Sequence, residues 1–278
     1  MLAEALLFAV ARLTSPRSRA AVIRDAVGLW ARARRCRAAW AEHEARTRAA
    51  IDRAIDGVAV RRTAVVLGSG LLRDVPIDRL SSMFDKVVLV DIVHLPTVRL
   101  KVLLRRYPNV SFMTRDISGY DRLAEQSWIK LATGQDDLGV RLDPLGFLRK
   151  IDELDLVISA NVLSQVAVGA RKRLEEKDRK AKDRKARFMP EDTVAQLVAG
   201  HLDGLAQLPC KTVIVTDVSY VRRRRDGTIV DTGDLLYGVT PPFPFDTWDW
   251  PVAPFGEEAA DEERVHRVIA AEDVAVDL

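Results

Sequence analysis

The sequence has little cysteine and no long apolar run, and each absence argues against a class of protein. Cys36 and Cys210 are the only two cysteines in 278 residues, and they lie outside any CxxC or Cys/His ligand spacing. We therefore expect no disulfide framework, no metal site and a reducing compartment, the cytoplasm. The apolar stretch at residues 5–11 is much shorter than the roughly 20 residues that span a bilayer, so we expect no signal peptide and no membrane span.

The chain also lacks a strong charge of either sign. Lys and Arg number 43 against 40 Asp and Glu, so the formal net charge of +3 indicates no partner by itself. Basic residues gather at 171–187, which we interpret as part of a charged helical excursion over 168–190, and at 222–225, which we expect in a turn. Neither run is interleaved with aromatic residues for base stacking, so a nucleic acid or another anionic partner is not favoured.

Helical patterns and short apolar runs alternate along the chain. Residues 1–58 are rich in Ala and Arg with apolar residues at helical spacing, which predicts two or three helices, one of them beginning at Pro16. Gly57 closes the last of them. Beyond it, short apolar runs predict strands separated by helices. The predicted strands cover residues 64–67, 87–90, 110–114, 154–159 and 212–216.

This alternation predicts an α/β fold, a doubly wound and mostly parallel sheet with helices on both faces. Right-handed crossovers then place the carboxyl ends of the parallel strands on one edge. A strand-like run at 266–270 predicts a C-terminal antiparallel hairpin that closes the sheet. We therefore divide the chain into an N-terminal helical segment (1–58) and a Rossmann-like domain (59–278).

A glycine turn and two acids follow the predicted strands. The first strand leads into Gly68-Ser69-Gly70, where missing side chains let backbone amides approach a ligand and a helix begin. Asp91 ends the second strand roughly 20 residues later, where a carboxylate accepts hydrogen bonds from both hydroxyls of a ribose. These residues predict an adenosine-containing cofactor. Asp116 follows the third strand, as a contact to the adenine or as a helix N-cap.

In this order the residues resemble the class I S-adenosylmethionine-dependent methyltransferases. In that family a Gly-rich turn follows the first strand, acids stand after the second and third, and the loop after the fourth faces the reacting methyl group; that loop is 159–161 here. The resemblance covers residues 60–275 and implies S-adenosylmethionine as the cofactor. The family usually has an acid where this chain has Val66, and often a third glycine where it has Leu72. The residues that the resemblance assigns to the cofactor are Gly68, Ser69, Gly70, Asp91, Asp116 and Asn161.

The reaction implied by the resemblance is methyl transfer to an acceptor, which we expect to be a small molecule. Alignment of the acceptor supplies most of the rate, with a base where the acceptor must lose a proton. No Asp-Pro-Pro-Tyr-like sequence follows the fourth strand, which argues against a DNA-base nitrogen as the acceptor. The catalytic residue stays open among Asn161, Asp217 and Tyr220.

Several other residues near the same edge have two interpretations. Trp248 and Trp250 form either a lid over an acceptor or the packing of the C-terminal hairpin on the sheet. Trp40 and His43, one turn apart on a predicted helix, face the same choice. We interpret His94 as a solvent-facing or helix-capping residue.

Two other functions stay open. A nicotinamide-dependent oxidoreductase, binding NAD or NADP, uses the same strand, turn and acid, although Arg73 stands where its GxGxxG pattern has the last glycine. A non-catalytic Rossmann-like scaffold would keep the fold without turnover.

Overall fold

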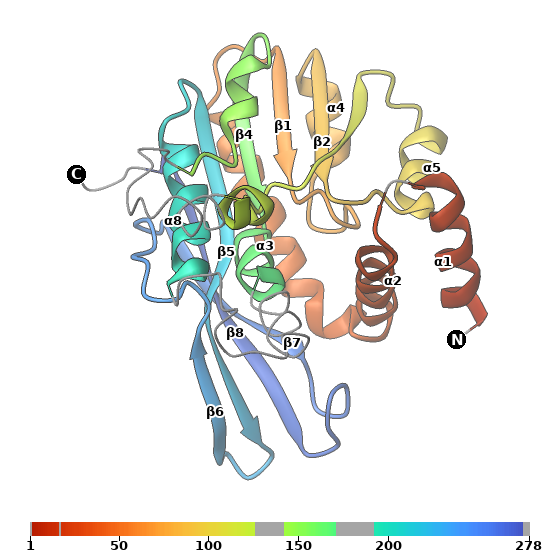
Figure 1. The fold of residues 1–278 in the computed structure, drawn as a ribbon, viewed down its shortest axis with the longest axis vertical. Helices are drawn as coiled ribbons and strands as arrows, with labels where there is room; N and C mark the ends of the chain where they lie inside the picture. Colours follow the sequence, from red (N-terminus) through yellow and green to blue (C-terminus); the bar gives the residue numbers. More distant parts are fainter. Residues whose placement is uncertain (1, 17, 126–141, 171–191, 275–278) are drawn as a thin grey trace.

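The computed structural model describes residues 2–16, 18–125, 142–170 and 192–274. One sheet runs through the centre in the order β3-β2-β1-β4-β5-β8-β7, with β6 paired to β5, and helices cover both of its faces (Figure 1). The helices are α1 (Leu2–Thr14), α2 (Ala20–Arg35), α3 (Arg37–Asp56), α4 (Ile77–Met83), α5 (Pro96–Leu104), the 3-10 helix η1 (Gly146–Lys150) and α8 (Thr193–Ala206). The strands are β1 (Thr63–Leu67), β2 (Lys86–Asp91), β3 (Val110–Thr114), β4 (Leu154–Ala160), β5 (Lys211–Arg224), β6 (Ile229–Asp234), β7 (Asp246–Ala253) and β8 (Glu262–Glu272).

The predicted doubly wound, mostly parallel sheet is confirmed. The neighbours β3-β2-β1-β4-β5 pair in parallel, and β8 joins β5 in an antiparallel ladder. Every residue of β1 is buried, because alternate side chains enter two cores, one on each face of the sheet. Val66 packs on the side of α3, α4 and α5, and Leu67 packs on the side of α8 and the helical residues 163–170.

Three helices precede the sheet, as the helical spacing predicts, and Gly57 follows the last of them. The predicted start at Pro16 is wrong, since α2 begins at Ala20. The Ser18 amide donates to the Ser15 carbonyl, which closes a turn there, and Arg19 is extended with ψ of 140°. The chain therefore turns before the helix starts.

The prediction that a helix begins directly at the glycine turn is also wrong. Gly68, Gly70 and Leu72 have φ values of +71°, +49° and +53°, whereas a right-handed helix needs negative φ. The next helix, α4, begins only after Pro76, seven residues beyond Gly70. The turn is therefore an irregular loop and not the N-terminus of a helix.

The fifth strand is much longer than predicted, and the expected turn at 222–225 is wrong for the first three arginines, which lie in the strand; only Arg225 lies in the turn that follows. β5 continues through Asp217 and Tyr220 to Arg224 because it pairs with β8 along most of its length and with β6 at its end. Figure 1 shows β5, β8, β7 and β6 reaching well past the ends of β1 and β2. This extension forms a wall beside the carboxyl edge of the parallel strands.

The predicted charged excursion over 168–190 falls mostly outside the described residues. Residues 168–170 of this excursion are helical, and its basic run at 171–187 lies outside the described residues. None of the helices in the described part of the chain is long and apolar enough to cross a membrane.

Candidate cofactor and acceptor site

The glycine turn lies where the strand order reverses. The chain leaves β1 toward β2 and β3 on one side and later adds β4 on the other, and α/β sheets bind ligands outside the carboxyl ends at such a point. Gly68 is needed there for two reasons. Its φ is +71°, and a Cβ atom would lie 2.6 Å from Cβ of Val162, just after β4. The backbone of the turn therefore lies directly against the end of β4.

Asp91 meets this turn from β2. Its Oδ2 accepts a hydrogen bond of 2.7 Å from the Gly70 amide, and its Oδ1 accepts one of 2.7 Å from the Ile92 amide. Burial raises the pKa of Asp91, and the Gly70 amide and His94 oppose that shift. Each carboxylate oxygen has a second lone-pair position, so the side chain is still able to accept hydrogen bonds from a ribose.

Asn161 and Asp74 connect the two sides of the reversal point. Asn161 has a φ of +52° and donates through Nδ2 to Asp74 Oδ2 at 2.7 Å. Burial raises the pKa of Asp74, and the hydrogen bond from Asn161 opposes the shift. The Oγ atom of Ser69 and the Oδ1 atom of Asn161 are buried without a hydrogen-bond partner among the described residues. Buried polar atoms need partners, so a ligand or water belongs against them.

Asp116 and His94 lie beyond β3 and β2. Asp116 Oδ1 accepts from the Ser118 amide at 2.9 Å, which closes a local turn before the helical residues at 120–125. The interpretation of His94 as solvent-facing is wrong, because only 1% of it is exposed. Its Nε2 donates to the Met113 carbonyl at 3.2 Å, and burial lowers the pKa of His94, so the ring is neutral.

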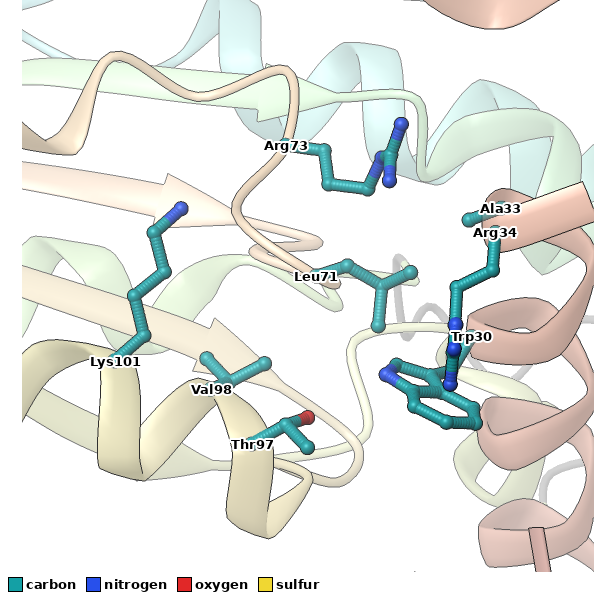
Figure 2. A pocket seen from close by; sticks show the side chains of 8 residues that line it. All are labelled: Trp30, Ala33, Arg34, Leu71, Arg73, Thr97, Val98 and Lys101. Carbon is teal, nitrogen blue, oxygen red and sulfur yellow. The ribbon is translucent and has the colours of Figure 1, made fainter. Parts of the chain in front are cut away.

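A cavity of about 240 Å³ opens beside the turn, between α2, α5 and the loop that follows Gly70. Figure 2 shows Leu71 between Arg73 and Val98, with the Trp30 indole opposite. Arg73 donates to Glu44 at 2.5 Å, and the Lys101 ammonium donates to the Leu72 carbonyl at 2.6 Å. Pockets for whole ligands start at about 300 Å³, so this cavity is large enough for only part of a nucleoside cofactor.

Asp217 is the centre of a hydrogen-bonded chain from three elements. Its Oδ1 accepts from Ser164 Oγ at 2.6 Å, and its Oδ2 lies 2.5 Å from Nδ1 of His266 on β8. Burial alone would raise the pKa of Asp217, but the hydrogen bonds from His266 and Ser164 outweigh it and hold the pKa below its usual value. Asp217 is therefore an ionised carboxylate with both oxygens occupied.

Aromatic residues share one face of the wall with this chain. Trp250 and Tyr220 stand opposite His266 in the registers of β7 and β5. Tyr220 OH donates to Asp231 at 2.8 Å, and His43 from α3 stacks on Trp250 with ring centroids 4.0 Å apart. The predicted contact between α3 and this region is thus present.

The two interpretations of the tryptophans apply to different residues. Trp248 is 2% exposed and donates through Nε1 to Nδ1 of His43 at 3.1 Å, so it packs the hairpin on α3. Trp250 is half-buried, and its Nε1 is buried without a hydrogen-bond partner among the described residues. Trp250 is therefore the tryptophan of the two whose indole N–H still lacks a partner among the described residues.

Charged residues of the wall pair within the chain. Each arginine of the run 222–225 has a carboxylate within 4.0 Å: Glu262 and Asp231 for Arg222, Glu263 for Arg223, Glu262 for Arg224 and Asp261 for Arg225. The run is therefore neutralised locally and is not a free basic patch. Among the described residues, no three His, Cys, Asp or Glu side chains gather in a way that would hold a metal ion.

Sequence reasoning places the turn, Asp91 and Asn161 at one edge, and the structure brings them together there. It missed Asp74, Ser164 and His266. His266 stands in the predicted last strand, but nothing in that strand's pattern shows that it meets Asp217.

Comparisons with known proteins concern the fold. No protein-family model matches the sequence, and no curated protein matches it. Among solved structures, N-methyltransferase NodS from Bradyrhizobium japonicum WM9 is 12% identical, with a TM-score of 0.35 over 82% of this chain and 95% of that one. An rRNA methylase from Streptococcus thermophilus is 9% identical, with a TM-score of 0.33 over 78% and 92%. A 1,6-didemethyltoxoflavin-N1-methyltransferase from Burkholderia thailandensis is 14% identical, with a TM-score of 0.32 over 80% and 78%.

At these identities the likeness assigns no residue of this chain to a function. The sheet itself, parallel in the order β3-β2-β1-β4-β5 with an antiparallel pair beyond, has the Rossmann-like form of the class I methyltransferases that the sequence resembles.

Proposed function

We propose that this chain binds S-adenosylmethionine at the carboxyl ends of β1, β2 and β4 and transfers its methyl group to a small acceptor. The main support for the proposal is the hydrogen bond from the Gly70 amide to the Asp91 carboxylate. The amide and the carboxylate are 21 residues apart in sequence and 2.7 Å apart in space, so the turn and the acid form one binding edge. The carboxylate keeps acceptor positions for the ribose hydroxyls, and such charge-assisted hydrogen bonds are stronger than neutral ones.

Asp74 supports the fit of the methionine part of the cofactor. The family usually has an acid two residues before the first glycine, and Val66 stands there in this chain, fully buried in the core. The irregular loop brings Asp74 to the same edge, where its carboxylate accepts a hydrogen bond of 2.7 Å from Asn161. We assign to it the ammonium group of the cofactor, with the buried Ser69 Oγ and Asn161 Oδ1 as further polar contacts.

Methyl transfer needs little catalytic help from the protein at the methyl donor. When bound, S-adenosylmethionine supplies a methyl carbon already bonded to a positively charged sulfur, so the residues of this chain need to hold and align the two reactants. A dinucleotide fits less well, because its pyrophosphate binds at a helix N-terminus and α4 begins seven residues past Gly70. The two cysteines are both free, which supports a reducing compartment and our proposal that the protein is cytoplasmic.

Isothermal calorimetry with S-adenosylmethionine, S-adenosylhomocysteine and NAD tests the proposal. We expect the first two to bind and NAD not to bind. Asp91→Ala should weaken binding more than tenfold, which corresponds to about 1.4 kcal/mol or more. Asp85→Ala is the matched control, since Asp85 is an exposed acid just before the opposite end of β2.

Three outcomes would count against parts of the proposal. Binding of NAD alone would refute the methyl donor. Equal affinities of the Asp91→Ala and Asp85→Ala variants would refute the ribose assignment, provided that circular dichroism shows both to be folded. Cofactor binding without transfer of a labelled methyl group to any component of a cell extract would favour the non-catalytic scaffold.

A further inference from the structure

The chain Ser164–Asp217–His266 is a buried polar arrangement that packing alone does not require. Asp217 is 4% exposed and ionised, and it holds His266 through Nδ1. A carboxylate only accepts, so Nδ1 carries a proton, and Nε2 is the ring nitrogen that is left to take or give one. Nε2 has no hydrogen-bond partner among the described residues, and 13% of the His266 side chain is exposed. The ring is thus oriented from inside and reachable from outside.

A β-bulge creates this arrangement. The register between β5 and β8 shifts between Asp217 and Ser219, so that Asp217 stands opposite Val268 and Tyr220 stands opposite His266. Without the extra residue, Asp217 and Tyr220 would lie on opposite faces of the strand, because they are an odd number of positions apart. The bulge therefore brings the carboxylate, the histidine and the tyrosine to one face, and bulges often orient side chains at active sites in this way.

This face lies next to the proposed cofactor edge. The Asn161 amide donates to the Val215 carbonyl at 2.8 Å, two residues before Asp217. Ser164, three residues after Asn161, stands in the first turn of the helical residues 163–170 and binds Asp217. The loop after β4 thus contacts Asp74 on one side and supports His266 on the other.

The surroundings of Nε2 indicate the class of acceptor. Trp250 meets the His266 ring edge to face at 5.9 Å and has a buried Nε1 donor without a partner among the described residues. Tyr220 lies on the other side, with ring centroids 6.0 Å apart. Aromatic walls favour a flat ligand, and the unpartnered indole N–H favours an acceptor atom on it.

We propose that His266 is the general base for an aromatic or heteroaromatic acceptor that carries an ionisable O–H or N–H, with Asp217 and Ser164 as positioning residues. This inference rests on the proposed function. In the transfer, Nε2 takes the proton of the acceptor, the electron pair of the acceptor oxygen or nitrogen forms the bond to the methyl carbon, and the electron pair of the broken carbon–sulfur bond stays on sulfur. Ser164 is no nucleophile here, because it binds the carboxylate and not the imidazole.

Chemical modification of the wild-type protein tests the base without an acceptor. Diethyl pyrocarbonate modifies unprotonated, reachable imidazole nitrogens, and the chain has four histidines. His266 should react first, because His43, His94 and His201 are at most 3% exposed. Asp217→Asn should slow the modification of His266 tenfold or more, since an amide donor at Nδ1 moves the ring proton to Nε2. If mass spectrometry shows that His266 reacts no faster than His201, the proposal is overturned.

Transfer is then measured with labelled S-adenosylmethionine and a panel of phenols and N-heterocycles. His266→Gln should lower the rate about 10²- to 10⁴-fold, the range for general bases, while calorimetry shows unchanged binding of S-adenosylhomocysteine. Arg267→Gln is the matched control, one residue along β8 and exposed. A His266→Gln variant as fast as the wild type, or a wild type that methylates none of the panel, would overturn this inference.

The dependence of the methyl-transfer rate on pH is an independent test of the His266–Asp217 pair. Asp217 and Tyr220 on β5 and His43 on α3 face His266, and Arg264 on β8 lies over the Tyr220 ring. The rate should fall in acid for the wild type, and Asp217→Asn should change the midpoint of that fall. If S-adenosylhomocysteine does not bind while His266 reacts as expected, the proposed function fails and the oriented histidine remains.

Discussion

Acid should destabilise this protein through His201, a residue outside the proposed site. His201 lies in α8 with none of its surface exposed, and its Nε2 is 2.9 Å from Ser159 Oγ. Burial lowers the pKa of His201 from 6.5 to about 4. Between these two values the unfolded chain binds more protons than the folded chain, so the free energy of unfolding falls as the pH falls.

The size of the effect follows from the two pKa values. Linkage gives a loss of about 2 kcal/mol between pH 7 and pH 5 from His201 alone. Burial lowers the pKa of His43 to about 4 as well, which adds a similar loss. Asp74 and Asp91 act in the opposite direction, because burial raises their pKa values and the folded chain then binds their protons more readily than the unfolded chain. The total change is therefore mixed, and a variant without His201 is needed to isolate its share.

Urea unfolding of the wild type and His201→Gln at pH 7 and pH 5 measures that share. The glutamine amide keeps a polar group opposite Ser159 and does not titrate. The wild type should lose about 2 kcal/mol more than the variant over this interval, because only the wild type has to protonate a buried ring on unfolding. Equal losses would show that His201 is not buried as a neutral ring. If the variant is too unstable to measure, the His201 signal in proton NMR of the wild type should show no titration above pH 5.

Two backbone positions give further predictions that urea unfolding checks. Gly68→Ala should lower the free energy of unfolding by roughly 2–4 kcal/mol, because alanine is strained at a φ of +71° and its Cβ would lie 2.6 Å from Val162 Cβ. Gly238→Ala is the control: its φ is +83° but the space around it is open, so the loss should be only about 1 kcal/mol. Similar losses of stability at both sites would refute the close contact at Gly68. Arg106→Gly should stabilise by about 1 kcal/mol, because the exposed Arg106 has a φ of +55° just after α5, where glycine is the usual residue; no gain would mean that the arginine side chain compensates for the strain.

The central strands could be predicted from sequence because the apolar runs that form them are visible within a few neighbouring residues. Residues 110–114 form β3 as predicted, and β1, β2 and β4 extend the predicted runs by only one or two residues. Strands buried on both faces appear in the sequence as short continuous apolar runs between polar segments. No distant partner has to be known to recognise them.

The second half of β5 shows the opposite case. Four consecutive arginines look like a turn or a solvated surface when only their neighbours in sequence are considered. In the structure, Arg223 pairs with Glu263 at 2.7 Å, and Glu262 lies within 4.0 Å of both Arg222 and Arg224. The acids of β8 lie roughly 40 residues further along the chain. The segment is a strand because of pairing that local patterns do not encode.

The same difference separates the two halves of the candidate site. The glycine turn and Asp91 belong to neighbouring parallel strands, whose carboxyl ends must meet, so topology alone brings them together. The other half is the wall beside that edge, where β5, β7 and β8 meet α3 from the start of the chain. Its geometry depends on the bulge in β5.

The sequence marks Asp217 as a candidate base because it stands near the predicted strand end. The structure instead fills both of its oxygens and leaves Nε2 of His266 without a hydrogen-bond partner among the described residues. A base of this kind is defined by what orients it and by which atom stays reachable, and neither property belongs to a single residue. The acceptor side of the site therefore has to be tested at His266, with Asp217 as the residue that sets which nitrogen carries the proton.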